Sequence, residues 1–435
     1  MRLSPVAGMV VLGWSIATAA QEQKPAVSPP PEPAKPPAFT FAMHGFIGGT
    51  VFVQDAAMRP GEGGFALWVA PQQTQTTPPT VGNIGGQQPK TDKLILSGDV
   101  RQSRFNLSVA GRPLLGFTPK GVLELDFFGG YAGGSAADTS PLPRMRHAYA
   151  ELGSDANRIL FGQTNDLLIA QVPVSLAHLG NPLGFVAGMQ GWRRPGVFGF
   201  HTLGDRKDRY AELAWEVGRA SWNDAMAGHV ITSGDRFGFQ AGEASGLPAV
   251  EARLMVGQGA EHSAFVVGHW NRVDRNGVDS TAPTPTGLDV VVGEAGGKTT
   301  LGPVTVLIEG FSGKNLGPIQ GAFGQIQPNT AGDVRELGGY GQLGLNFTRE
   351  ISLWGFVGTE RLDRSQAIAA NFAVLQNTIA YGVLQYRAEG FAVGLEWDHY
   401  WTRTRNNVTV GGVRDASLDG VQQANKASLN GIYFF

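Results

Sequence analysis

Apolar and polar residues alternate through most of the chain after residue 39, and this pattern limits the folds that the chain can adopt. In the stretch FAVGLEWDHYWT, one face holds Phe391, Val393, Leu395, Trp397 and Trp401, and the other holds Ala392, Gly394, Glu396, Asp398 and Thr402. Successive side chains of a β-strand point to opposite faces, so a period of two predicts strands with one apolar and one polar face. The same alternation occurs in RFNLSVAG (104–111), GVLELDFFG (121–129) and YGQLGLNFT (340–348).

We place sixteen strands on this pattern. Their ranges are 39–54, 93–111, 118–130, 144–153, 157–163, 193–203, 206–219, 247–258, 261–274, 286–297, 299–313, 335–348, 350–362, 377–388, 391–405 and 423–435. Connectors after odd-numbered strands are long, and those after even-numbered strands shrink to a few residues, as in GSDA at 153–156. A transmembrane antiparallel β-barrel has this asymmetry because its short turns lie at the periplasmic rim and its long loops outside, whereas a soluble sandwich has no reason to sort its loops.

The composition agrees with such an all-β barrel and argues against other classes. Charged residues make up 16% of the 435, below the ~25% of a typical soluble domain, and the mean hydropathy is −0.08. No apolar run after the N-terminus approaches the roughly 20 residues of a spanning helix. The net charge of −2 gives no reason to expect nucleic acid as a partner. With no cysteine in the chain, disulfides, thiolate zinc sites and Fe–S clusters are excluded.

The first 38 residues differ from the rest. MRLSPVAGMVVLGWSIATAA places Arg2 before an apolar run that ends in small residues, which predicts a cleavable signal peptide over 1–20. The stretch KPAVSPPPEPAKPPA (24–38) favours an extended polyproline conformation, so 21–38 is interpreted as a proline-rich periplasmic linker. The barrel is then expected to occupy 39–435.

The last residues, LNGIYFF, fit the strand that closes the barrel. Tyr433 and Phe435 share a face with Leu429, while Lys426 and Asn430 lie on the other face. Closure matters because an unpaired strand edge in hydrocarbon costs several kcal/mol for each unsatisfied group. The ending also resembles the C-terminal signature that the barrel assembly machinery reads in bacterial outer-membrane proteins. Together with the signal peptide it predicts a multi-pass barrel in a Gram-negative outer membrane, surrounded by lipid and lipopolysaccharide.

Four stretches resemble the DcaP-like trimeric porins: VRQSRFNLSVAG (100–111), GVLELDFFGG (121–130), RMRHAYAELG (144–153) and ILFGQTND (159–166). They follow one another in order over the second to fifth strands, and the rest of the chain matches only as a generic barrel. The resemblance implies a sixteen-stranded homotrimer that passes small, mainly anionic solutes such as dicarboxylates. Two features depart from the family. The proline-rich stretch stands where members carry a helical N-terminal segment, and Asn165 stands where we expect an aromatic residue.

The connector after the fifth strand is long and largely apolar, NDLLIAQVPVSLAHLGNPLGFVAGMQGW (Asn165–Trp192). Exposed to water, it would form a large hydrophobic patch. Folding into the lumen avoids this exposure, and in general porins the corresponding loop narrows the pore. The alternative is that the connector packs against neighbouring loops or caps the barrel.

The candidate pore-lining residues cluster around this connector in the sequence. Arginine keeps its charge and offers a planar fork to carboxylates, so several arginines on one wall favour anions. The basic candidates are Arg104, Arg144, Arg146, Arg193 and Arg194. The acidic candidates, expected across the lumen, are Glu124, Asp126, Glu212 and Glu216. For Arg193 and Arg194 a structural role or pairing with lipid phosphates is equally open.

One strand fits the barrel pattern poorly. In 144–153, the face opposite Arg144 and Arg146 holds His147, Tyr149 and Glu151, and so polar a face does not belong in lipid. Either a subunit interface shelters this face, or the strand assignment is wrong.

The sequence therefore predicts a porin for passive diffusion of small hydrophilic, preferably anionic solutes through an arginine-lined constriction. No catalytic residue, cofactor or metal site is expected, since there is no G-x-S-x-G, no H-E-x-x-H and no histidine pair at metal spacing. Two alternatives stay open. One is a barrel enzyme whose catalytic residues come from different strands, and the other is a structural or adhesive barrel without an open channel.

Overall fold

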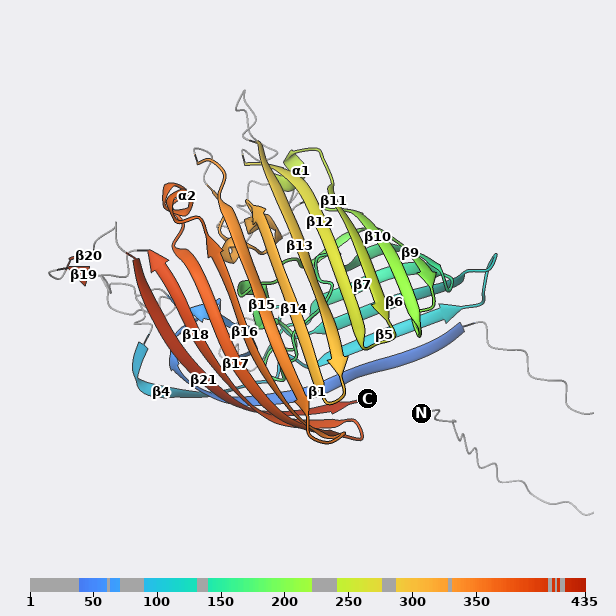
Figure 1. Cartoon of the computed structure of the whole chain (residues 1–435), viewed down its shortest axis with the longest axis horizontal. Helices are drawn as coiled ribbons and strands as arrows, with labels where there is room; N and C mark the ends of the chain where they lie inside the picture. Colours follow the sequence, from blue (N-terminus) through green and yellow to red (C-terminus); the bar gives the residue numbers. More distant parts are fainter. Residues whose placement is uncertain are drawn as a thin grey trace, which may run out of the picture. The chain divides into compact units, whose positions relative to one another are not determined.

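Neighbouring strands of the chain pair in antiparallel fashion and close into a β-barrel in the computed structural model (Figure 1). The structure describes residues 39–60, 63–70, 90–130, 140–220, 241–275, 287–327, 331–405, 409–410, 413–414 and 419–435. The expected signal peptide (1–20) and linker (21–38) lie outside these residues. Phe39–Phe435 forms one unit by its internal contacts.

The barrel has the sixteen strands that the alternation predicted. Seventeen segments are hydrogen-bonded in the sheet, and β4 and β5 are two parts of one strand because both pair with β1. The segments are β1 (Phe39–Ala56), β4 (Lys90–Asp99), β5 (Arg104–Gly111), β6 (Thr118–Asp126), β7 (Arg144–Gly153), β8 (Asn157–Asn165), β9 (Arg193–Gly204), β10 (Arg209–Gly218), β11 (Ala249–Gln258), β12 (His262–Asp274), β13 (Gly287–Leu301), β14 (Val304–Lys314), β15 (Arg335–Asn346), β16 (Ile351–Leu362), β17 (Val374–Ala388), β18 (Phe391–Arg405) and β21 (Asp419–Phe434).

Smaller elements lie in the connectors. They are β2 (Met58–Pro60), η1 (Gly63–Phe65), β3 (Ala66–Val69), η3 (Leu183–Val186), α1 (Ala241–Ala244), η4 (Gly317–Ile319), η5 (Ala322–Gly324), α2 (Arg364–Ala369), β19 (Thr409–Val410) and β20 (Val413–Arg414). Among the described residues, no helix is both long enough and apolar enough to cross a membrane.

The C-terminal strand closes the barrel as predicted. β21 pairs with β18 on one side and with β1 on the other, from Phe46 opposite Phe434 to Gln54 opposite Lys426. Short turns alternate with long connectors around the whole barrel. The turn between β17 and β18 contains only Glu389 and Gly390, both with positive φ (44° and 83°). This is the backbone that two-residue hairpins require, because its twist matches that of the strands.

Among the strand boundaries that differ from the prediction, two have clear local causes. The predicted strand 93–111 is interrupted at 100–103, where the Asp99 carboxylate accepts a hydrogen bond from the Arg101 backbone N–H (2.9 Å) and turns the chain. The predicted break between 297 and 299 is wrong, because β13 continues to Leu301 and the turn is formed by Gly302 and Pro303. Gly302 has a φ of 59°, which only glycine adopts readily.

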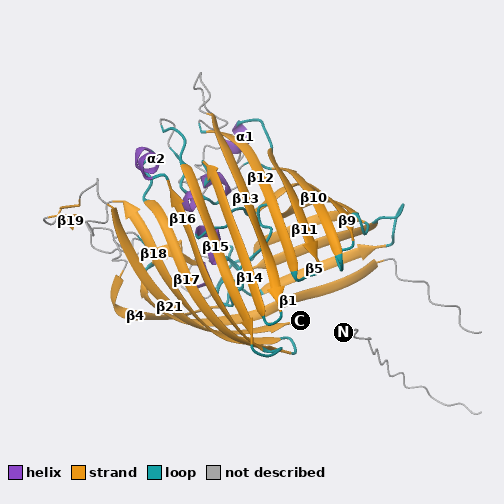
Figure 2. Cartoon of the chain, viewed as in Figure 1, coloured by secondary structure: helices purple, strands orange, loops and turns teal. Residues whose placement is uncertain are grey.

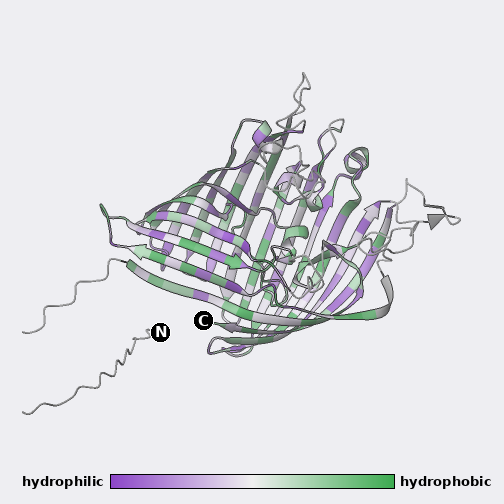
Figure 3. Ribbon diagram, turned by 180° about the vertical axis from the view of Figure 1, so that it is seen from behind, coloured by the Kyte–Doolittle hydropathy of each residue, from purple (hydrophilic) through white to green (hydrophobic). Residues whose placement is uncertain are grey.

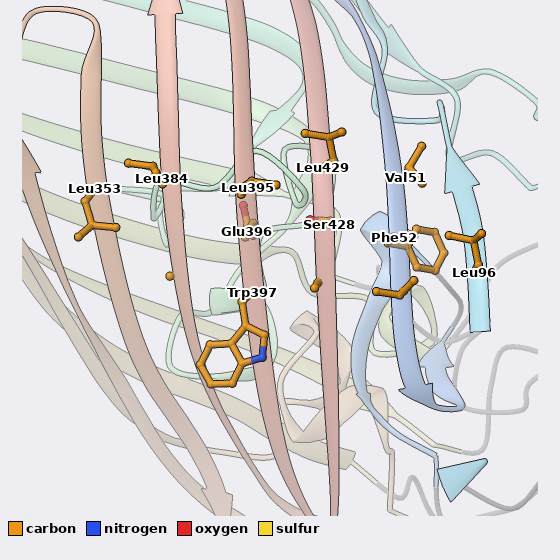
Figure 4. Close-up of a pocket in the computed structure, with 13 residues that line it drawn as sticks. Val51, Phe52, Leu96, Leu353, Leu384, Leu395, Glu396, Trp397, Ser428 and Leu429 are labelled. Carbon is orange, nitrogen blue, oxygen red and sulfur yellow. The ribbon is translucent and has the colours of Figure 1, made fainter. Parts of the chain in front are cut away.

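The outer face of the barrel is apolar. Along β18, exposed residues such as Leu395 and Trp397 alternate with buried ones such as Glu396 and Asp398. Figure 3 shows this alternation of hydrophobic and hydrophilic residues along the strands. An outer hollow has a volume of about 580 Å³. Its lining includes the apolar side chains of Val51, Leu96, Leu353, Leu384, Leu395, Trp397 and Leu429 (Figure 4). Apolar side chains exposed in this pattern face lipid, so the barrel spans a membrane.

Parts of three long connectors fold back inside the barrel: 57–60 with 63–70, 166–192 and 315–327 (Figure 2). Asn377 of β17 joins the first two, since its Nδ2 donates to both the Leu67 and Val186 carbonyls (3.1 Å each). One buried apolar cluster contains Leu67, Phe185 and Phe323, one side chain from each segment. The lumen is therefore partly filled by loops with an apolar core of their own.

A β-bulge explains the polar face of the strand that fitted the pattern poorly. Along β7, His147 pairs with Glu124, but Met145 already pairs with the next residue of β6, so Arg146 is an extra residue. Arg146 and His147 consequently both point into the lumen, where each approaches Glu124. One extra residue reverses the parity of a strand. The polar face therefore points inward without either a wrong assignment or a sheltering interface.

Candidate pore constriction

Three of the predicted arginines meet two of the predicted carboxylates on β5, β6 and β7. Arg144 binds Asp126 through two hydrogen bonds, from Nε (2.9 Å) and Nη2 (2.6 Å). Arg146 donates to Glu124 (2.8 Å) and to Asp126 (3.0 Å). Arg104 Nε lies 3.5 Å from Glu124. We call this group, with Arg193, the arginine wall.

Arg193 adds a further positive charge to the arginine wall. Its guanidinium lies 4.0 Å above the Trp192 ring, and it interacts electrostatically with Arg144, Arg146 and Asp126. The wall thus holds four guanidinium groups and two carboxylates, Glu124 and Asp126, an excess of two positive charges. Cation–π contacts with Trp192 and the carboxylate pairs hold the guanidinium planes in place.

The carboxylates Glu124 and Asp126 lie beside the arginines and not across the lumen from them, which corrects that expectation. The reason is register: β6 and β7 are hydrogen-bonded neighbours, so inward residues of both strands share one patch. The strand order places other carboxylates opposite. β7 and β15 are eight strands apart in the ring of sixteen, so Glu336 on β15 and Glu294 on β13 lie across the lumen, whereas the inward glutamates of β11 and β18 lie four and five strands from β7.

These four inward glutamates, which we call the carboxylate wall, hold the inward segments by their backbone amides. Its members are Glu251 on β11, Glu294 on β13, Glu336 on β15 and Glu396 on β18. Glu251 accepts from Leu167 N (2.6 Å), and Glu396 accepts from Leu176 N (2.8 Å) and Ala177 N (3.1 Å). The Glu294 and Glu336 carboxylates accept from Gln190 N (3.4 Å) and Ala322 N (2.9 Å), respectively.

The segment 166–192 meets the arginine wall with its carbonyl groups. Leu179 O accepts from Arg104 Nη2 (2.9 Å), and Gly180 O accepts from Arg144 and Arg146 (3.3 Å each). The predicted connector therefore runs through the lumen, where four of its amides meet the carboxylate wall and the carbonyls of Leu179 and Gly180 meet the arginine wall. Each contact satisfies a buried backbone group that would otherwise cost about 1–3 kcal/mol.

The arginines differ in how far they remain accessible. The side chains of Arg104 and Arg144 are 20% and 17% exposed, compared with 8% for Arg146 and 1% for Arg194. Only groups that still reach water can exchange water for a solute. Arg104 and Arg144 are consequently the arginines best placed to contact a solute directly.

The remaining candidates lie in two other places. Arg194 is fully buried between Asp166 (3.0 Å), Glu216 (3.4 Å) and Glu251 (3.7 Å), at the base of the segment 166–192. This position suits a structural role. Glu212 lies on β10 among arginines that the sequence analysis did not single out.

The sequence analysis also missed Arg101. Its position in the interrupted stretch 100–103 brings its guanidinium 4.9 Å from the Phe128 ring, beside the arginine wall. In an unbroken strand, Arg101 would share the outward face of Phe105, and the turn at Asp99 changes this direction. The carboxylate wall could have been found by parity, since its glutamates alternate with outward apolar residues.

One group of ligand-type side chains could hold a metal ion among the described residues: His178, Glu396 and Asp398. The Lys426 ammonium already lies between two of them, 2.5 Å from His178 Nε2 and 2.9 Å from Asp398. A lysine at this position supplies the positive charge that a cation would bring. Burial, with Lys426 beside the ring, lowers the pKa of His178. The group thus fastens the inward segment to β18 and β21.

No protein-family model and no curated protein matches this sequence. Solved structures match its fold. The outer membrane channel DcaP of Acinetobacter baumannii has a TM-score of 0.65 at 14% identity, over 92% of this chain and 98% of that one. OmpT of Vibrio cholerae, in a trimer form, has a TM-score of 0.51 at 12% identity, over 92% and 100%. An anion-selective porin from Comamonas acidovorans has a TM-score of 0.53 at 10% identity, over 91% and 100%.

The resemblance to the DcaP-like porins is thereby confirmed at the level of the fold. This chain shares the sixteen-stranded barrel fold of these outer-membrane proteins, and its apolar outer surface agrees with the predicted location in the outer membrane.

Proposed function

We propose that this protein is a porin through which small hydrophilic anions, dicarboxylates among them, diffuse passively across the outer membrane. The observation that carries the proposal is the charge of the arginine wall, with four guanidinium groups against two carboxylates. The wall lies beside the segment 166–192, whose passage through the lumen reduces the space that a solute can use. One protein of similar fold is an anion-selective porin, which agrees with this proposal.

The mechanism needs no covalent chemistry. An entering carboxylate exchanges hydration water for guanidinium N–H groups of Arg104 and Arg144, which are partly exposed and keep their charge. Arg146 and Arg193, more deeply buried, add to the local positive potential. Because Glu124 and Asp126 neutralise half of the charge, binding stays weak enough for the solute to leave, as conduction requires.

A homotrimer is part of the proposal. One similar structure is described as a trimer form, and the apolar outer face offers surface for contact with a second copy as well as with lipid. The remaining partners in the proposal are lipopolysaccharide and the barrel assembly machinery.

The proposal does not include an enzymatic activity. Ser175, His178 and Asp398 do lie near one another, but the Ser175 hydroxyl donates to Glu396 (2.7 Å) and not to the histidine ring. All three side chains are buried, so the hydroxyl is not exposed to a substrate in the lumen.

The test is the reversal potential of single channels in a planar bilayer under a KCl gradient, for the unchanged protein and for Arg144→Gln. We expect anion selectivity, reduced in the variant. Arg272→Gln is the matched control, because Arg272 is an exposed arginine paired with Asp289 on β13 (3.0 Å). Cation selectivity of the unchanged protein would contradict the charge assignment, and a folded barrel without conductance would contradict the porin itself.

A further inference from the structure

A second group of arginines surrounds Glu212 on β10, whose side chain is only 2% exposed. Arg206 forms a hydrogen bond to one carboxylate oxygen, and Arg253 Nη2 lies 3.3 Å from the other. Arg158 Nη2 lies 3.9 Å from the same carboxylate. The three guanidinium groups come from β8, β11 and the connector 205–208 and converge on one acid.

This group carries more positive than negative charge. Glu151 is the only other carboxylate paired with any of the three arginines in the described part of the chain, 3.6 Å from Arg158 Nη1. Three guanidinium groups against two carboxylates leave one positive charge in excess. Each guanidinium has five N–H donors, and the two carboxylates accept hydrogen bonds from only some of them.

Two of the arginines are accessible and held in fixed orientations. The side chains of Arg158 and Arg206 are 40% and 47% exposed. Their guanidinium groups lie over aromatic rings, Arg158 over Phe200 (4.3 Å) and Arg206 over Tyr210 (5.0 Å). Stacking of this kind restrains the plane of the guanidinium and leaves its N–H edge available to a ligand.

An open hollow of about 420 Å³ adjoins the group. Arg158 and Lys120 form part of its lining, together with Glu151, Ser154 and Asp155. A space of this size can hold a small organic acid. The hollow and the group share Arg158, so a solute in the hollow would meet an arginine that is already oriented.

The group lies at the short-turn end of the barrel, away from the arginine wall. Arg206 is in the short connector 205–208, and β8 begins only one residue before Arg158. Thr164, whose hydroxyl lies 2.9 Å from His147 Nδ1 near the arginine wall, is six residues further along β8. Six residues of strand span about 20 Å. Short turns mark the periplasmic rim.

We propose that Arg158, Arg206 and Arg253 form a second anion-binding site, at the periplasmic mouth, which takes the carboxylate groups of small organic acids. The proposal rests on the proposed function, that the barrel conducts anions. A solute leaving the arginine wall would reach a second set of guanidinium donors before it enters the periplasm. Arg253 also donates to Leu167 O (3.2 Å), which connects this site to the beginning of the segment 166–192.

The test measures the block of chloride current by succinate, added in turn to each side of a bilayer that contains oriented channels. The variant is Arg158→Gln combined with Arg206→Gln, which leaves the buried Arg253 in place. We expect the half-blocking concentration for succinate on the short-turn side to rise about tenfold, the effect of losing charge-assisted hydrogen bonds. Block from the long-loop side should change less than about twofold on the same energetic scale.

Arg272→Gln is again the control, because it removes an exposed, ion-paired arginine elsewhere. An anion-selective variant with unchanged succinate block on both sides would overturn the site and leave the proposed function intact. An equal loss of block from both sides would also overturn it, since that result indicates a general change in the pore. The selectivity of the unchanged protein is measured first. If it were not anion-selective, the proposed function itself would fail, whatever the variants show.

Discussion

The two walls of the lumen hold the same inward segment by opposite chemistry. The arginine wall meets carbonyl groups of residues 179 and 180 and keeps some of its N–H donors exposed to water. The carboxylate wall meets backbone amides and is buried throughout, with Glu396 only 2% exposed. This difference indicates a division of roles, in which the carboxylates position the loops and the arginines act on the solute. If so, changes on the carboxylate wall should affect stability and pore size, and changes on the arginine wall should affect selectivity.

The largest effect should follow from Glu396→Ala. The substitution removes the acceptor for Ser175 Oγ, Leu176 N and Ala177 N, all buried, so the unfolding free energy should fall by about 3 kcal/mol or more. Single-channel conductance should rise as the segment 166–192 is released, and limited proteolysis should cut within it. Glu396→Gln retains one acceptor oxygen, so its unfolding free energy should fall less than that of Glu396→Ala. Unchanged conductance together with unchanged proteolysis would show that the segment does not depend on this glutamate.

Gly188→Ala should have the next largest effect. Gly188 has a φ of 114°, and a Cβ there would collide with the backbone of Gly339 on β15. The combined strain should cost about 1–3 kcal/mol and displace the segment from the carboxylate wall. Thermal unfolding in detergent would measure the loss. Gly355→Ala is the matched control, because its Cβ would meet open space. Equal losses in the two variants would contradict the close approach of segment and wall.

On the arginine wall, Arg146→Gln should change selectivity more than stability. Glu124 keeps Arg104 as a partner and Asp126 keeps Arg144, so we expect a stability loss of only about 1–2 kcal/mol. The reversal potential in a KCl gradient should nevertheless shift toward zero. A stability loss as large as that of Glu396→Ala, with selectivity unchanged, would reverse the roles assigned to the two walls.

The smallest effect should be a pH dependence at His178. Burial, with Lys426 beside it, lowers the pKa of the ring in the folded protein, so the unfolded chain binds the proton more readily. The stabilising contribution is complete above the unfolded pKa of about 6.5 and is lost as the pH falls below it. Asp398, which pairs with both His178 and Lys426, opposes this loss. Between pH 8 and pH 5, the denaturation midpoint should fall less for His178→Asn than for the unchanged protein. If the two proteins showed the same dependence on pH, this role of the histidine would be contradicted.

Much of the fold could be predicted because parity is a local property. Whether Leu395 or Glu396 faces lipid depends only on its place in an alternating run, so sixteen strands and the closing pairing followed from the pattern. Inward and outward faces were predicted wrongly where a single residue interrupts the alternation of the strand. The Asp99 turn brought Arg101 back inside, and the extra Arg146 in β7 turned His147 inward. Such irregularities depend on single hydrogen bonds and pairings, which periodicity does not register.

The sequence by itself determined the strand number and, wherever no bulge or turn interrupts a strand, the face on which each residue lies, since both follow from the alternation along a strand. Only the tertiary structure decided which charges meet. Glu124 and Asp126 became partners of Arg144 and Arg146 because register joins β6 to β7, whereas Arg194 was buried among Asp166, Glu216 and Glu251. Likewise, closure of the sheet into a ring decided where the carboxylate wall, on strands between β11 and β18, lies relative to the arginines. Distances around a ring are set by closure, which no stretch of the sequence contains.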